Sequence, residues 1–244
     1  DQAYAAFVMA LLLELRLANV SRSGHYLPTD ATDRWLERDS HELSSELVDT
    51  WLAGHVWDES VADALAQAIY GNPAVAQLRA CLPAIVASLP EAGATVASVR
   101  ATVEFTRPVL VSRLDATGGW PMIFDRLLRS QQWLGLLELA DGERPSVRPT
   151  PLAAVLQGNS KRGPGAQQFV IQPNREIVAP PDLALPVLRD LLACTEGAPT
   201  TGAFVQNVTN ASVRRALETG WTGPAVLEFL AAHAAKGVPQ TVQH

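Results

Sequence analysis

Residues 169–178 read FVIQPNREIV, and this stretch decides the fold of the C-terminal third of the chain. The short apolar run at 169–172 predicts a strand, and residues 176–178 predict a second strand. Residues 173–175, Pro-Asn-Arg, lie between the two runs and supply turn chemistry. The stretch is therefore expected to form a β-hairpin.

The residues after this hairpin predict a small module of alternating strands and helices. Leucines at helical spacing predict a helix that Asp182 can cap, and residues 204–208 predict a third strand. Asn210 can cap a further helix, and Thr222 is expected to start the last one. The expected order is strand, turn, strand, helix, strand, helix, helix.

Four short patterns occur in this region in a definite order: FVIQPN at 169–174, TNASVRRA at 209–216, VLEFL at 226–230 and VPQ at 238–240. In this order they resemble the N-terminal domain of the XPB helicase family, which large bacterial helicase-associated proteins also carry. The resemblance covers the last third of the chain. It implies a small mixed α/β module that helps a helicase to engage DNA, including damaged DNA.

The chain departs from those helicases because it contains no ATPase core. The nearest approach to a phosphate loop is GNSKRG at 158–163, but Pro164 follows where such a loop needs Lys and then Ser or Thr. The five histidines are scattered, and no metal-ligand spacing or hydrolase signature is present. A helix N-terminus explains the acidic pair Asp58-Glu59. We therefore expect no enzyme, no cofactor and no metal.

Composition limits the class of protein. Hydrophobic residues make up 48% of the chain and charged residues 18%, which predicts a folded protein of about two domains. Cys81 and Cys194 stand singly in apolar helical contexts, so buried thiols in a reducing cytoplasm are expected. The longest apolar run, at 4–13, is too short to span a bilayer, and no membrane partner is expected. Because Asp1 is not a natural start, we expect a fragment of a longer protein.

The net charge of −6 is unevenly distributed along the chain. Residues 1–99 carry −8, residues 100–162 carry +3 and residues 163–244 carry −1. Nucleic-acid affinity comes mainly from neutralised phosphates, so an acidic chain is not expected to bind DNA indiscriminately. Any contact with DNA is expected to be local and to use the middle segment.

A second pattern occurs twice before this module. Residues 4–36 and residues 127–156 each predict helix, strand, polar loop, strand, Pro-Thr and helix, which resembles the second half of a winged-helix domain with the loop as the wing. The second copy also has a plausible first half, with helices expected over 75–88, from Ser98 to Pro108 and from Pro121.

The predicted fold class is α+β and mainly helical, with a winged-helix-like N-terminal part followed by a small mixed α/β module. The glycine-rich linker at 158–167 is the clearest boundary. The predicted domains are a partial winged-helix-like segment at 1–54, a winged-helix-like domain at 55–160 and the XPB N-terminal-like module at 166–244.

Six basic residues are the candidate DNA contacts. The third helix of a helix-turn-helix protein enters the major groove, and here that helix is expected to present two arginines on its outer face. Two more arginines flank the expected wing, and two basic residues follow in the linker. The six candidates are Arg126, Arg129, Arg144, Arg148, Lys161 and Arg162. For each of them, an ordinary solvated surface charge is the alternative interpretation.

Two functional hypotheses follow. In the first, the chain is a non-catalytic DNA-engaging accessory region of a helicase-associated protein in DNA repair or transcription. In the second, it is a protein-interaction or regulatory scaffold that binds a helicase or nuclease partner, which the acidic residues 1–99 favour. Winged-helix domains serve both uses, so the fold alone does not decide between them.

Overall fold

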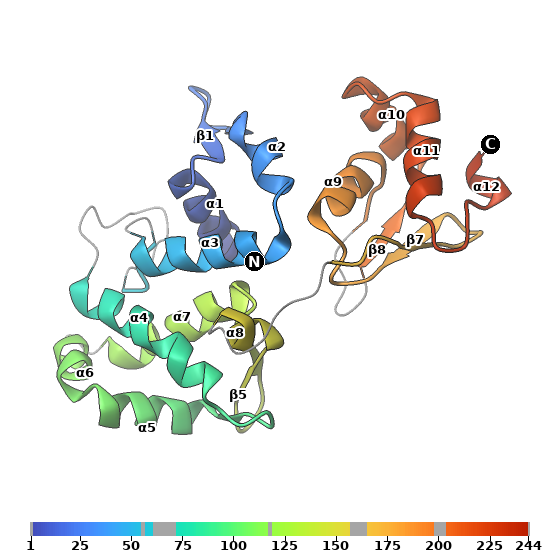
Figure 1. The fold of residues 1–244 in the computed structure, drawn as a ribbon. Helices are drawn as coiled ribbons and strands as arrows, with labels where there is room; N and C mark the ends of the chain where they lie inside the picture. The colour runs from blue at the N-terminus through green and yellow to red at the C-terminus, as the bar shows by residue number, and fades with distance from the viewer. Residues whose placement is uncertain are drawn as a thin grey trace. The chain divides into compact units, whose positions relative to one another are not determined.

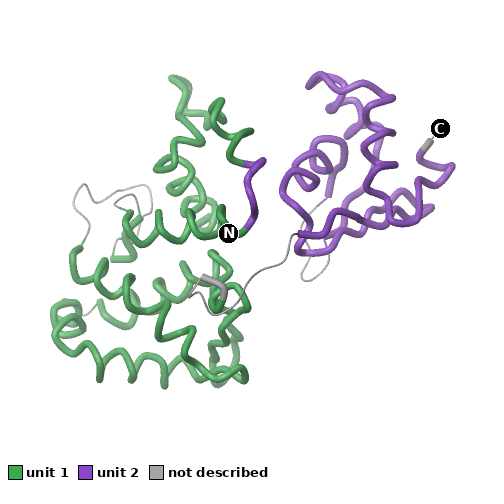
Figure 2. Tube along the Cα trace, in the orientation of Figure 1, with its two compact units in different colours: residues 1–35, 41–162 green, residues 36–40, 163–244 purple. Residues whose placement is uncertain are grey.

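The computed structural model describes residues 2–54, 57–60, 72–116, 119–156, 165–197 and 204–243. They form a mainly helical protein with three small antiparallel sheets, which confirms the predicted α+β class (Figure 1). The chain divides into two compact units (Figure 2). Residues 1–35 and 41–162 form unit 1, and residues 36–40 and 163–244 form unit 2. No helix in the described ranges is long and apolar enough to cross a membrane.

The N-terminal part of the chain follows the order expected for the first copy of the repeated pattern. Its elements are α1 (Gln2–Glu14), β1 (Ala18–Val20), β2 (Tyr26–Pro28), α2 (Ala31–Leu36) and α3 (Ser40–Ala53). The two strands pair antiparallel with each other. They form a separate two-stranded sheet.

The second part of unit 1 contains every helix and strand expected for the second copy, together with two elements that the sequence did not predict. Its elements are α4 (Pro73–Ala87), β3 (Ala94–Thr95), α5 (Val96–Thr106), α6 (Pro108–Asp115), α7 (Trp120–Trp133), β4 (Leu137–Ala140), β5 (Ser146–Pro149) and α8 (Pro151–Leu156). The strands form one sheet in the order β3-β5-β4. The unpredicted elements are β3 and α6.

Proline explains one of these differences. Pro108 ends α5 as expected, but it also stands at the start of α6, where its missing N–H group would have no partner in any case. Pro83 lies inside α4 without ending it. The sequence therefore located the break before Pro108 correctly and missed the helix that the same residue begins.

One hydrophobic core joins the two N-terminal segments. Phe7 of α1 and Trp51 of α3 belong to the same buried cluster as Phe124 of α7. The ring of Phe7 lies 5.2 Å from the ring of Trp57 and 5.2 Å from that of Trp133, measured between centroids. Trp51 is almost completely buried in this core. The segments divided at residue 54 by the sequence analysis thus share their core.

A buried polar cluster ties the same helices together. The Glu59 carboxylate accepts hydrogen bonds from Trp51 Nε1 at 2.9 Å, from Ser130 Oγ at 2.9 Å and from Arg79 Nη2 at 2.6 Å. Arg79 also donates to the backbone carbonyls of Trp51 and Trp57. Glu59 is therefore half of an interior ion pair, which its interpretation as a charge at a helix N-terminus did not predict.

Unit 2 has the predicted element order and one further short helix. Its elements are β6 (Val170–Ile171), β7 (Glu176–Ala179), α9 (Leu185–Cys194), β8 (Phe204–Asn207), α10 (Asn210–Glu218), α11 (Gly223–His233) and α12 (Gln240–Gln243). The strands pair antiparallel in the order β6-β7-β8, so the predicted hairpin at 169–178 is confirmed. A second core gathers around Phe169, Ile177 and Leu191.

Two predicted helix caps in unit 2 were wrong by one or two residues. Ala184, and not Asp182, is the residue that precedes α9. The Asp182 carbonyl and the Ala184 N–H both form hydrogen bonds with the backbone of Ala166, so the helix begins only after them. Thr209 caps α10 in place of Asn210. Its hydroxyl accepts from Ser212 N, while the Ser212 hydroxyl accepts from Thr209 N, so the two residues form a reciprocal capping box.

Candidate nucleic-acid interface

Helix α7 presents a buried face and an exposed face, as its sequence predicts. Ile123, Phe124, Leu127 and Leu128 are almost fully buried in the core of unit 1. Residues 122, 125 and 129 on the other side are exposed. The exposed face therefore carries the carboxylate of Asp125 and the guanidinium of Arg129, which have opposite charges.

Arg126 is half-buried, and its guanidinium is engaged within unit 1. Arg126 Nη1 donates a hydrogen bond of 3.0 Å to the backbone carbonyl of Glu59. This bond fastens α7 to the segment that holds the interior ion pair. A contact between Arg126 and DNA stays a prediction, and the structure gives this side chain a positioning role inside the fold.

Arg129 is exposed, and the structure places it beside the β4–β5 hairpin. Its Nη1 donates to Gln132 Oε1 at 2.8 Å within the same helix. Arg129 and Asp125 line a small cavity of about 220 Å³ together with Asp141 and Pro145 of the hairpin loop. The outer face of α7 and the loop therefore form one continuous surface.

The hairpin carries the next two candidates. Arg144 is exposed in the loop at 141–145. Arg148 on β5 lies opposite Glu138 on β4 and forms an ion pair with it, with an Nε to Oε2 distance of 3.1 Å. This hydrogen bond and the charge of Glu138 raise the pKa of the Arg148 guanidinium. Glu138 thus competes with any phosphate for Arg148.

The pairing of Arg148 with Glu138 was missed by the sequence analysis, although a signal for it exists. In an antiparallel hairpin, residues opposite each other on neighbouring strands have adjacent side chains. A loop at 141–145 makes residues 138 and 148 such a pair, as the observed register shows. Counting outward from the loop would have located this ion pair.

Lys161 and Arg162 lie outside the described residues. The remaining candidates share their surface with carboxylates. The exposed charged residues on the outer face of α7 and on the hairpin are Asp125, Arg129, Glu138, Asp141, Glu143, Arg144 and Arg148. Because acidic residues are interspersed with the arginines, this face can hold a phosphate only at particular points.

In unit 2, several residues of the four ordered patterns are core or cap residues. Phe169 is buried, and its ring centroid lies 6.0 Å from that of Phe229. Thr209 forms the capping box of α10, and Leu230 is fully buried. These residues of the patterns therefore reflect the architecture of the module.

Comparison with known families gives one match. A family model described as helicase conserved C-terminal domain matches residues 169–244, the same segment that resembles the XPB domain. No curated protein matches the chain. Residues 169–244 are thus similar to the conserved C-terminal domain of helicases, which supports a helicase-associated region in this part of the chain.

Proposed function

We propose that the chain is a non-catalytic, DNA-engaging accessory region of a helicase-associated protein that acts in DNA repair or transcription. The family match at residues 169–244 supports the association with helicases. The order of the four patterns in that segment supports an XPB N-terminal-like module in particular. Two free thiols, Cys81 and Cys194, fit a reducing compartment such as the cytoplasm.

The observation that carries the DNA-engaging part is the continuity of α7 with the hairpin loop. The elements from α4 to β5 follow the order helix, strand, three helices, strand, loop and strand. The sheet order is β3-β5-β4. This order supports a winged-helix domain with one additional helix, α6. In that arrangement α7 is the helix that enters a groove of the duplex, and the loop at 141–145 is the wing.

The charges on this face determine what kind of binding is expected. Arg129 and Arg144 are exposed on the helix and the wing, whereas Arg148 is paired with Glu138. A face with few unpaired guanidiniums neutralises few phosphates, so the expected affinity is modest and falls with added salt. The two exposed arginines therefore make the first contacts in this proposal.

The test is fluorescence anisotropy of the whole chain with labelled single-stranded, duplex and forked DNA, at low and near-physiological salt. Saturable binding that weakens as salt is added is the expected result, because phosphate contacts release counterions. Absence of binding even at low salt would overturn the proposal.

The mixed charge of the same face favours a second function. Four exposed carboxylates stand on the outer face of α7 and on the hairpin, and they repel phosphate. A protein-interaction scaffold for a helicase or nuclease partner is compatible with such a surface. Binding of labelled DNA by such a scaffold would depend only weakly on the form of the DNA. The anisotropy series therefore separates the two functions.

A further inference from the structure

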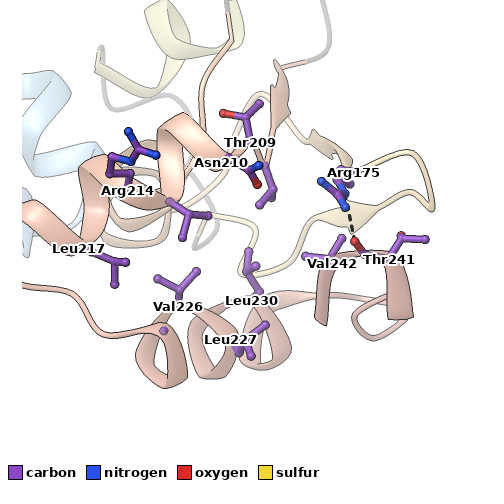
Figure 3. A pocket seen from close by; sticks show the side chains of 13 residues that line it. Arg175, Thr209, Asn210, Arg214, Leu217, Val226, Leu227, Leu230, Thr241 and Val242 are labelled. Carbon is purple, nitrogen blue, oxygen red and sulfur yellow. Dashed lines mark hydrogen bonds between the residues drawn. The ribbon is translucent and has the colours of Figure 1, made fainter. Parts of the chain in front are cut away.

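A groove crosses unit 2 between α10, α11 and the short helix α12 (Figure 3). Its volume is about 480 Å³. Pockets of roughly 300–1000 Å³ hold a drug-sized molecule, and so they hold a few side chains of a protein partner. Thirteen described residues line it, and they come from these three helices, from the segments that flank them and from the turn between β6 and β7, which supplies Arg175. The groove is therefore large enough to be a binding site.

The floor and the rim of the groove are aliphatic. Val226 and Leu230 are buried at its floor. Leu217 of α10 and Leu227 of α11 line it as well, yet 47% and 37% of their surfaces are exposed. Exposed leucines on two neighbouring helices offer apolar area that a partner can remove from water.

Cations flank this aliphatic surface. The lining includes Arg175 and Arg214 and no acidic residue. Arg214 is exposed, and its side chain makes no hydrogen bond or ion pair within the described ranges. Arg175 Nε donates to the backbone carbonyl of Thr241 at 3.0 Å, which holds that guanidinium beside α12 (Figure 3). The groove thus presents positive charge next to an apolar surface.

We propose that this groove binds an acidic amphipathic helix of a partner protein. The apolar stripe of the helix lies against Leu217 and Leu227, and its carboxylates meet Arg175 and Arg214. Apolar grooves between helices are a recurrent way to recognise amphipathic helices. Single-stranded nucleic acid fits less well, because the lining contains no aromatic ring on which a base can stack. The proposal is independent of DNA binding by α7, since the two surfaces share no residue.

The experiment uses the whole chain and two fluorescein-labelled peptides of about 18 residues, a length that allows a helix to form. One peptide has leucines at helical spacing on one face and glutamates on the other, and its matched partner has lysine in place of every glutamate. The glutamate peptide is expected to bind saturably and at least about tenfold more tightly than the lysine peptide, because only the former meets opposite charge.

Two variants locate the site. Arg214→Ala removes an exposed charge, and Arg175→Asn removes the other while keeping a residue that tolerates the positive φ of 71° at this position. Each is expected to weaken binding of the glutamate peptide by about threefold, as is usual for an exposed ion pair. Lys236→Ala is the control, because it deletes an exposed positive charge that does not line the groove. It is expected to leave the affinity unchanged.

Several results would overturn the proposal. Lack of saturable binding, equal affinity for the two peptides, or undiminished binding by the double variant Arg175→Asn, Arg214→Ala would each do so. A labelled single-stranded oligonucleotide is measured in parallel. If the oligonucleotide binds, loses affinity in the arginine variants and displaces the peptide, the groove is a nucleic-acid site and the protein-partner proposal is wrong. Circular dichroism of each variant confirms that its helices are intact.

Discussion

Arg79 Nη2 and Glu59 Oε2 lie 2.6 Å apart in the interior of unit 1, and the two side chains are 3% and 0% exposed. An ion pair that is removed from water is costly to break from one side, because the remaining charge stays buried without its counter-ion. The pair also joins α4 to the segment at 57–60, which Arg126 links to α7. It is therefore a sensitive point for the stability of unit 1.

Glu59→Gln is expected to destabilise the protein strongly. The amide leaves the Arg79 guanidinium buried without a countercharge, and loss of one partner of a buried pair costs about 3–5 kcal/mol. Denaturant unfolding followed by circular dichroism measures the change in the free energy of unfolding. Glu138→Gln, an exposed carboxylate changed in the same way, is the control and should leave stability almost unaltered. A loss below about 1 kcal/mol for Glu59→Gln would contradict this view of the pair.

Arg129→Ala tests the helix face of the proposed DNA interface. Removing one phosphate contact is expected to weaken binding to all DNA sequences alike and to reduce the slope of affinity against salt by about 1. Arg113→Ala on α6 deletes another exposed positive charge elsewhere in unit 1 and serves as the matched control. Anisotropy titrations at several salt concentrations supply both slopes. Identical slopes for the two variants would remove Arg129 from the interface.

The ion pair on the hairpin predicts opposite effects from its two members. Glu138→Gln frees Arg148 for a phosphate and is expected to tighten DNA binding, whereas Arg148→Gln is expected to weaken it. Because both side chains are well exposed, neither change should shift the unfolding midpoint measurably. The same anisotropy assay compares the two variants. Parallel changes in affinity would show that this part of the hairpin does not meet DNA.

Cys194 predicts a pH dependence of stability. Burial raises the pKa of its thiol to about 11, while an unfolded cysteine ionises near 8.5. Between these values the unfolded chain has released the proton and the folded chain has kept it. The contribution of this thiol to the free energy of unfolding is therefore fully present below about pH 8.5. It falls by about 1.4 kcal/mol per pH unit as the pH rises through this window.

The measurement compares wild type with Cys194→Ala in denaturant unfolding from pH 7 to pH 11. The substitution should lower stability at pH 7 by removing a buried side chain, and it should flatten the decline above pH 8.5. The difference in slope isolates the thiol from the other groups that titrate at high pH. Parallel curves for the two proteins would mean that Cys194 ionises equally in the folded and unfolded states.

Thr209→Ala tests the capping box of α10. The substitution leaves Ser212 N without its acceptor and is expected to cost about 1 kcal/mol of unfolding free energy. Thr222 caps α11 through a single longer bond of 3.3 Å to Ala225 N, so Thr222→Ala is expected to cost less. Equal losses in the two variants would contradict the expectation that the shorter bond to the Thr209 hydroxyl stabilises its helix more than the bond to the Thr222 hydroxyl does.

Much of the fold could be predicted because each element has its own local pattern. The hairpin at 169–178 combines two apolar runs with turn residues, and α7 has four apolar residues at helical spacing. In contrast, β3 has only two residues and exists because it pairs with β5, which is distant along the chain. No local pattern can reveal such a strand. Gly93 allows this approach, because a Cβ atom there would lie 2.4 Å from the Val147 carbonyl oxygen.

The candidate site was predictable only in part, for a related reason. Helical spacing correctly indicates that Arg129 faces outward. It does not indicate that Arg126, one position outside the apolar stripe, bonds to a carbonyl contributed by another segment. Likewise, Arg79 stands among apolar residues of α4, and its role depends on a carboxylate that the local sequence does not show. The tertiary structure determines which groups a long polar side chain contacts, and the helical spacing of apolar residues in the sequence does not reveal those groups.

Phe7 of α1 packs against Trp133, the last residue of α7, so α1 completes its packing only after α7 has been made. Domains tend to fold as units during synthesis, beginning from the N-terminal end of the chain. Here α1 cannot complete its packing early, and the apolar side chains of Phe7 and Leu11 stay uncovered while the intervening helices emerge. The order of synthesis thus creates an interval in which the nascent chain is prone to aggregate, and slowing translation within α4 to α6 would lengthen that interval.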